Sequence, residues 1–138
     1  MIIRLGYMSY KDGEPRYDSR FAEYLEGVEN AGIPYGIYFY SNAVSVTEAK
    51  YEAEGVIRML GDAKPDLPIF YDWERTDSEG DRTLNADAFM ISACCRSFCD
   101  DLSAAGYDCG IYLNSYLLQN DVYDEFLGGY PIWMAEYD

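Results

Sequence analysis

Five short runs of apolar and aromatic residues recur along the chain, with longer segments of helical period between them. Each run predicts a β-strand: IIRLGY (2–7), YGIYFY (35–40), PIFYDW (68–73), CGIYLN (109–114) and PIWMAEY (131–137). The segments near 19–31, 46–61, 84–105 and 116–127 predict helices. Such strict alternation implies parallel strands joined by right-handed crossovers. We therefore expect an α/β fold whose parallel sheet is either doubly wound or part of a barrel.

An internal similarity points to equivalent units. The pattern A-G-x-x-x-G-I-Y-x-x-S starts once at Ala31 and again at Ala105. In both copies a glycine is placed to end a helix, and a strand follows with Gly-Ile-Tyr. Convergence of two ordinary β/α units explains the match as well as a duplication does, and either origin favours equivalent units in one sheet. No glycine-rich phosphate loop follows any strand in the sequence, which disfavours a nucleotide-binding Rossmann unit.

The net charge of the chain limits the kinds of partner that it can bind. The 138 residues include 25 acidic and 10 basic side chains, for a formal net charge of −15. Such a chain repels polyanions, so we expect neither nucleic acid nor membrane as a partner. The sequence contains no run of about 18 apolar residues. Met1 leads directly into the first expected strand, so no signal peptide is expected in this chain.

The four cysteines are Cys94, Cys95, Cys99 and Cys109, and three of them fall in one expected helix. Cysteines this close on a helix are poorly placed for a disulfide. The chain has no histidine, so a zinc site would need thiolates alone. We expect free, mostly buried thiols; a Cys99–Cys109 disulfide and a thiolate metal site remain open alternatives.

Two carboxylates stand where one strand ends, because PIFYDW is followed by Glu74 and contains Asp72. In parallel α/β folds functional groups collect at the carboxyl ends of the strands. Residues two apart on a strand share a face, with Cα atoms about 6.6 Å apart. Their carboxyl groups can then approach the roughly 5 to 9 Å at which glycosidases use a carboxylate pair. The acid with the more apolar surroundings would keep its proton longer. The alternative is an acidic strand end that faces water.

The other strand ends are rich in aromatic and amide side chains. Aromatic rings stack on the apolar faces of sugars, and Tyr and Asn supply hydrogen bonds, so this collection suits a carbohydrate groove. Taken one at a time, each tyrosine is better explained as a core or interface residue, and it is their clustering at strand ends that is informative. The candidate substrate-binding residues are Tyr7, Tyr38, Tyr40, Tyr112, Asn114, Trp133 and Tyr137.

Five segments in this order resemble the glycoside hydrolase family 25 lysozymes, the muramidases of bacteria and their phages. They are IIRLGY, AGIPYGIYFYSNAVSVTEAKYEA, PIFYDWE, GIYLNSY and IWMAEY. YDWE stands where the family carries its Asp-x-Glu pair, and WMAEY resembles the family's Trp-x-Ala-x-Tyr strand. The resemblance extends from the first residue to the last.

The resemblance implies a modified β/α barrel that cleaves the β-1,4 bond between N-acetylmuramic acid and N-acetylglucosamine with retention, without a metal or other cofactor. Glu74 would be the general acid and base. Asp72 would stabilise the oxocarbenium-like centre or orient the acetamido group of the substrate. The partner would be the peptidoglycan glycan strand, and the place of action the cell wall or the extracellular space. The residues implied to line the groove are Tyr38, Tyr40, Tyr112 and Trp133.

The sequence also departs from the family. Family members begin with a further strand that carries an Asp in a GIDVS-like motif, and they finish with further strands that carry another Asp. Neither feature is present in this sequence. We therefore expect one domain over 1–138, truncated at both ends, that forms an incomplete TIM-like (β/α) barrel of about five strands.

The open edges of the expected sheet predict self-association. Apolar strands at the two edges would leave backbone groups without partners. We therefore expect the chain to form a homo-oligomer through these edges. Three other interpretations remain open at this point: a carbohydrate-binding module without catalysis, a self-associating scaffold subunit, and a piece of a longer enzyme.

Overall fold

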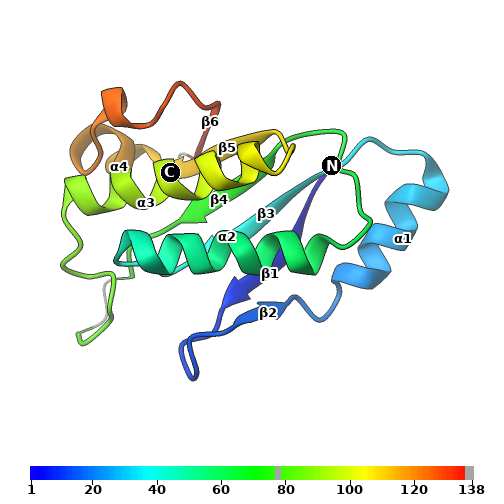
Figure 1. Cartoon of the computed structure of the whole chain (residues 1–138), viewed down its shortest axis with the longest axis horizontal. Coiled ribbons are helices and arrows are strands. Elements are labelled where there is room, and N and C mark those ends of the chain that lie inside the picture. Colours follow the sequence, from blue (N-terminus) through cyan, green and yellow to red (C-terminus); the bar gives the residue numbers. More distant parts are fainter. Residues whose placement is uncertain (77–78, 136–138) are drawn as a thin grey trace.

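The described part of the chain forms one six-stranded sheet in the computed structural model, which describes residues 1–76 and 79–135 (Figure 1). The spatial order is β2-β1-β3-β4-β5-β6. All neighbouring strands are parallel except β1 and β2. This confirms the alternating α/β organisation, with five parallel strands in a TIM-like arrangement that is not closed. The strands are β1 (Ile2–Met8), β2 (Pro15–Tyr17), β3 (Gly36–Ser41), β4 (Ile69–Trp73), β5 (Cys109–Asn114) and β6 (Ile132–Ala135).

The helices follow the expected order, with shifted ends. They are α1 (Phe21–Ala31), α2 (Val46–Leu60), α3 (Ala88–Ala104), α4 (Ser115–Asn120) and the 3-10 helix η1 (Asp124–Phe126). The side chain of Ser45 caps α2 by accepting a hydrogen bond from the Glu48 amide at 3.1 Å. Helix α3 begins later than the expected residue 84, because Asp87 caps it by accepting from the Met90 amide at 2.8 Å. The helix expected over 116–127 is instead the short α4 followed by η1.

Strand β2 is an addition to the predicted elements, and it corrects the prediction of two bare sheet edges. It pairs antiparallel with β1 over Gly6–Met8 and so covers part of that edge. A Cβ atom on Gly6 would lie only 2.0 Å from the carbonyl oxygen of Arg16, so this approach requires glycine. In the described residues, β6 at the other end of the sheet has a neighbour on one side only.

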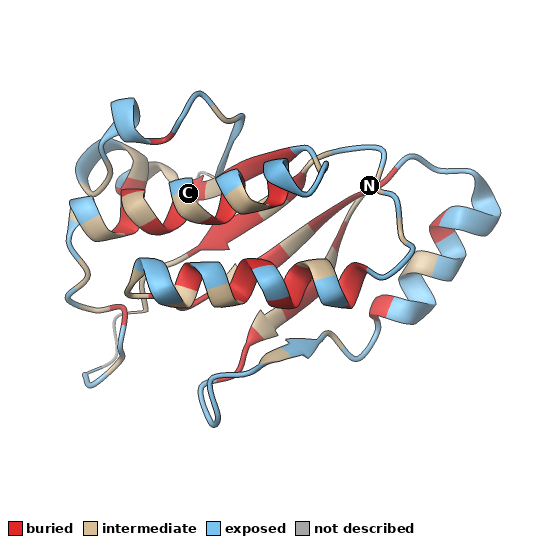
Figure 2. Cartoon of the chain, viewed as in Figure 1, coloured by how far each residue is buried: buried red, intermediate tan, exposed pale blue. Residues whose placement is uncertain are grey.

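The core lies between one face of the sheet and the two longest helices. Helices α2 and α3 lie side by side over the sheet, and their buried residues face it (Figures 1 and 2). Tyr71 of β4 is fully buried and stacks on Phe98 of α3, with ring centroids 4.2 Å apart. All four cysteines are free and buried, as expected. The sulfur atoms of Cys99 and Cys109 lie 3.0 Å apart.

The two copies of the repeated pattern occupy equivalent places. Gly36 begins β3 and Gly110 lies at the start of β5. A Cβ atom at these glycines would lie 2.8 Å from the Pro68 carbonyl oxygen and 3.0 Å from that of Pro131, respectively. Each glycine therefore permits the next strand to approach closely. Within the described residues, no helix is long and apolar enough to span a bilayer.

Candidate active site

Strand β4 delivers its two acids to the face of the sheet opposite α2 and α3. Side chains alternate along a strand, and Tyr71 and Trp73 are fully buried on the helix side. Asp72 and Glu74 therefore lie on the other face. Asp72 is only 5% exposed, whereas Glu74 is half-buried at the end of the strand.

The two carboxyl groups are not electrostatically equivalent. Burial raises the pKa of Asp72 to about 8, and the negative charge of Glu74 and a hydrogen bond with its side chain reinforce the shift. The charge of Arg4 acts in the opposite direction. The Oδ1 atom of Asp72 has no hydrogen-bond partner among the described residues. Burial beside a second carboxylate therefore favours the protonated form of Asp72.

A hollow of about 280 Å³ lies directly over this pair. The rings of Tyr112 and Trp133 meet edge to face with centroids 4.9 Å apart, and Trp133 makes the same kind of contact with Phe70 at 5.3 Å. Trp133 is 40% exposed, so one part of its ring is available to a ligand. The lining residues are Tyr38, Asp72, Glu74, Tyr112 and Trp133, all of them singled out in the sequence.

The other candidate substrate-binding residues that the structure describes are not among those that line this hollow. Tyr40 stands opposite Asp72 in the β3–β4 register, and Tyr7 stands opposite Tyr40 in β1. Burial raises the pKa of Tyr40, with Tyr10, Glu74 and Asp72 adding to the shift. The side chain of Asn114 caps α4 by accepting from the Leu117 amide at 2.8 Å. Tyr137 lies outside the described residues.

Two arginines that the sequence did not single out also shape the site. Arg4 lies on the same face of the sheet, with its guanidinium 5.1 Å from the ring centroid of Tyr7. Its position between apolar residues of a strand is the signal by which the sequence could have identified it.

Arg75, directly after Glu74, donates hydrogen bonds to the carbonyl oxygens of Leu84 at 2.6 Å and Ala86 at 2.9 Å. These bonds tie the loop after β4 to the end of the strand.

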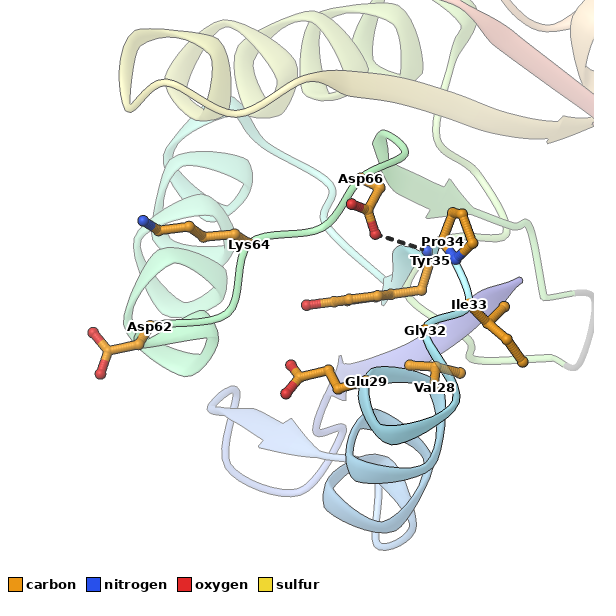
Figure 3. A pocket seen from close by; sticks show the side chains of 9 residues that line it. All are labelled: Val28, Glu29, Gly32, Ile33, Pro34, Tyr35, Asp62, Lys64 and Asp66. Atoms are coloured by element: carbon orange, nitrogen blue, oxygen red, sulfur yellow. Dashed lines mark hydrogen bonds between the residues drawn. The ribbon is translucent and has the colours of Figure 1, made fainter.

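A larger hollow of about 410 Å³ lies at the opposite ends of the strands, before β3 and β4 (Figure 3). One side chain in it, that of Asp66, accepts a hydrogen bond from the Tyr35 amide at 3.2 Å. In β/α folds this end of the sheet maintains the scaffold, while the carboxyl ends of the strands carry the chemistry. The smaller hollow with the acid pair is therefore the candidate active site.

Acidic and thiol side chains can also hold metal ions when several of them converge. Across residues 1–76 and 79–135, no group of three or more Cys, Asp or Glu side chains is arranged to do so. Asp72 and Glu74 lie side by side among aromatic residues in the hollow. A carboxyl that holds a proton beside a second carboxylate is the arrangement used for proton transfer to and from a substrate oxygen.

Comparison with known proteins gives a consistent result. The family model described as "Glycosyl hydrolases family 25" matches residues 3–138. The chain is 26% identical over 135 residues to the "Autolytic lysozyme" of Clostridium acetobutylicum, a match that covers 98% of this chain and 38% of that protein. The chain therefore spans about two fifths of the length of this relative.

Solved structures show the same similarity. The modular autolysin LytC from Streptococcus pneumoniae superposes with a TM-score of 0.75 at 27% identity, covering 86% of this chain and 27% of LytC. The spore cortex lytic enzyme SleM of Clostridium perfringens superposes with a TM-score of 0.76 over 96% of this chain and 44% of SleM. SleM is 20% identical, so its likeness supports the fold alone.

Proposed function

The chain belongs to the glycosyl hydrolases family 25, and on that premise we propose that it hydrolyses peptidoglycan at the cell wall as a 1,4-β-N-acetylmuramidase. The bond cleaved would join N-acetylmuramic acid to N-acetylglucosamine. The observation that carries the proposal is the buried Asp72 beside Glu74 under a hollow lined by aromatic rings. The name of the lysozyme relative supports the activity, and a LytC structure that holds a synthetic peptidoglycan ligand supports the substrate.

The chemistry follows from one proton shared by two carboxyl groups. In the resting chain burial favours this proton on Asp72. Passing it to Glu74 leaves Asp72 ionised, and Glu74 then protonates the glycosidic oxygen as the bond to the sugar breaks. The ionised Asp72 stabilises the positive charge that develops on the sugar, or orients its acetamido group. Glu74 finally accepts a proton from the attacking water, and passing that proton back to Asp72 returns the pair to its starting state.

Arg4 favours the ionised form of Asp72. Its charge lowers the pKa of Asp72 and so partly offsets the effect of burial. A pair poised in this way changes protonation at little cost when positive charge appears in the hollow. A sugar bound in the hollow would exclude water and so strengthen the electrostatic interactions of Asp72 with Arg4 and Glu74.

The aromatic residues supply the binding surface. The exposed part of Trp133 offers an apolar face on which a sugar ring stacks. The ring of Tyr112 packs edge to face against Trp133 and holds it in place. Tyr38 borders the hollow from the other flank. A hollow of about 280 Å³ is just below the range of roughly 300 to 1,000 Å³ that holds small molecules. It therefore suits one sugar unit, with the rest of the strand lying along the open sheet.

The test is the release of new reducing ends from purified peptidoglycan. Glu74→Gln is expected to remove turnover while the fold remains intact. Glu54→Gln is the matched control, because Glu54 is an exposed acid on the outer side of α2 and its loss should leave the rate unchanged. Equal rates for the wild type and Glu74→Gln would exclude the proton-transfer role of Glu74. Retention on peptidoglycan without any released product would leave carbohydrate binding as the function.

A further inference from the structure

Glu52 is a buried acid that the proposed mechanism does not use. It lies in α2 and is fully buried, within a stripe formed by Ala49, Ala53 and Val56. Helix α2 lies over the sheet near β3 (Figure 1). Burying an ionised carboxylate among apolar groups is costly, so a glutamate at this position calls for specific partners.

Those partners are two hydroxyl groups from adjacent strands. The Oε1 atom of Glu52 lies 2.7 Å from Ser41 Oγ of β3 and 2.7 Å from the hydroxyl oxygen of Tyr71 of β4. The two hydroxyl oxygens are themselves 2.7 Å apart. Three oxygen atoms from α2, β3 and β4 thus form a closed triangle of hydrogen-bond contacts.

Counting protons assigns the state of Glu52. Three contacts at this distance need three protons, because two oxygens without a proton between them repel. The hydroxyl groups of Ser41 and Tyr71 supply two, so the third comes from the carboxyl group. With a proton on Oε1, each of the three oxygen atoms can donate to one neighbour and accept from the other around the ring. Ser41 Oγ also accepts from the Ala43 amide at 3.0 Å, which fills its remaining position.

The surroundings of Glu52 agree with a neutral acid. Burial raises the pKa of Glu52 to about 7, against the opposing hydrogen bonds from Tyr71, Ser41 and the Asn42 backbone. The groups that face it are Glu48 on its own helix, Tyr71 on β4, and Cys94 and Cys95 on α3. None of these groups is a cation.

The ring of hydrogen bonds lies directly behind the acid pair. Tyr71 and Trp73 flank Asp72 on β4. Tyr71 is held by the last residue of β3, and Trp73 by the segment that follows β3. Tyr71 is held in the ring with Ser41, and the indole nitrogen of Trp73 donates to the Ala43 carbonyl oxygen at 2.9 Å. Because side chains alternate, fixing these two on the helix side also fixes where Asp72 and Glu74 point on the other side.

We propose that Glu52 is a positioning residue that acts as a neutral carboxylic acid, closing a hydrogen-bonded ring with Ser41 and Tyr71 that orients the Asp72–Glu74 pair. Its importance for turnover rests on the proposed hydrolase function, whereas its effect on the geometry of the pair does not. A second layer of hydrogen bonds behind a catalytic group is a common way to hold that group in place.

The experiment follows the titration of Asp72 by NMR in protein labelled with ¹³C at the aspartate carboxyl groups, with Asp72→Asn to assign the signal. Glu52→Gln keeps the shape and neutrality of the side chain but makes only part of the ring, because an amide oxygen only accepts and an amide nitrogen only donates. The titration midpoint of Asp72 should therefore move less in Glu52→Gln than in a variant without any polar group at this position. Glu52→Leu removes the ring, so the titration midpoint of Asp72 should move down by about one pH unit or more as its burial relaxes. Glu54→Leu on the exposed side of α2 is the control and should change nothing. If Glu52→Leu does not fold, Tyr71→Phe breaks the ring by removing one hydroxyl group and should shift Asp72 in the same direction.

Two results would overturn the proposal. An unchanged Asp72 midpoint in the folded ring-breaking variant would show that Glu52 serves stability alone. A midpoint displaced equally by Glu52→Gln and Glu52→Leu would show that a neutral polar side chain at this position does not hold the pair. Where the wild type releases reducing ends, Glu52→Leu should lower kcat at least tenfold with KM unchanged, and Glu52→Gln should lower it by less. If the wild type does not hydrolyse peptidoglycan, the function fails while the NMR titration still decides the role of Glu52.

Discussion

Replacing Asp72 with asparagine should stabilise the protein, and the gain should grow with pH. An Asp in an unfolded chain has a pKa of about 3.9, whereas the pKa of Asp72 in the folded chain is about 8. Between these values the native state binds the proton that the unfolded state has released. The free energy of unfolding therefore falls as the pH rises from 4 to 8. An asparagine side chain resembles the protonated acid in shape and has no proton to lose, so the substitution removes this loss.

The size of the effect follows from the shift. At pH 7 the unfolded carboxyl group lies about three pH units above its pKa, and each unit corresponds to about 1.4 kcal/mol, which gives roughly 4 kcal/mol as an upper value. We expect Asp72→Asn to be more stable than the wild type by about 2 to 4 kcal/mol at pH 7 and by less than about 0.5 kcal/mol at pH 4. The loss of activity would accompany this gain, as is common when a strained active site is relaxed.

Urea denaturation followed by tryptophan fluorescence measures the effect. Trp73 is fully buried next to Asp72 and Trp133 is 40% exposed, so unfolding changes the surroundings of Trp73 most. The control is Glu54→Gln, which removes one negative charge from the surface of a chain whose net charge is −15. The same stability profile from pH 4 to 8 for Asp72→Asn and Glu54→Gln would refute the reasoning, because general charge repulsion would then explain both.

Four further predictions concern binding, packing, thiols and assembly. Trp133→Ala should weaken binding to soluble peptidoglycan fragments about tenfold or more, measured by calorimetry, with little change in stability. Gly110→Ala should cost about 1 to 3 kcal/mol in urea denaturation because the added Cβ would lie 2.7 Å from the Phe70 ring, whereas Gly27→Ala on open α1 should stabilise by about 0.5 to 1 kcal/mol. Burial raises the pKa of Cys94 to about 12, so alkylating reagents should modify the cysteines only after unfolding, as mass spectrometry would show. The outer edge of β6 should pair between copies, and a monomer in light scattering at micromolar concentration would contradict this.

Much of the architecture is readable from the sequence because the strands are continuous apolar runs. Strands buried on a parallel sheet need no alternation, and glycines and capping residues mark the helix ends. Strand β2 escapes prediction because it has three residues, begins with proline and carries Arg16, so nothing in it resembles a strand. It exists because Gly6 lets the chain pack closely against β1. Such a pairing depends on tertiary contact and leaves no local pattern.

Part of the site is also predictable from the sequence. Asp72 and Glu74 are close in sequence, and the register of parallel strands brings Tyr112 and Trp133 beside them. Asn114 illustrates the limit, because its side chain caps the following helix, a use that competes with ligand binding.

Glu52 is a residue that helical periodicity could have singled out. It stands in a segment with several other acids and resembles a surface residue of an amphipathic helix. Its spacing from Ala49 and Val56, three before and four after, nevertheless places it on the buried stripe of α2. The sequence alone could have flagged a buried acid at this position. Its partners Ser41 and Tyr71 become visible only when β3 and β4 are paired.

The central claim is that Asp72 and Glu74 form a working glycosidase pair, and mass analysis of products tests it most directly. Purified peptidoglycan would be incubated with the wild type, Glu74→Gln and Glu54→Gln, and the released muropeptides would be reduced and analysed. Fragments that end in reduced muramic acid are expected from the wild type and Glu54→Gln, and none from Glu74→Gln. Fragments that end in reduced glucosamine, or equal release by Glu74→Gln, would contradict the claim.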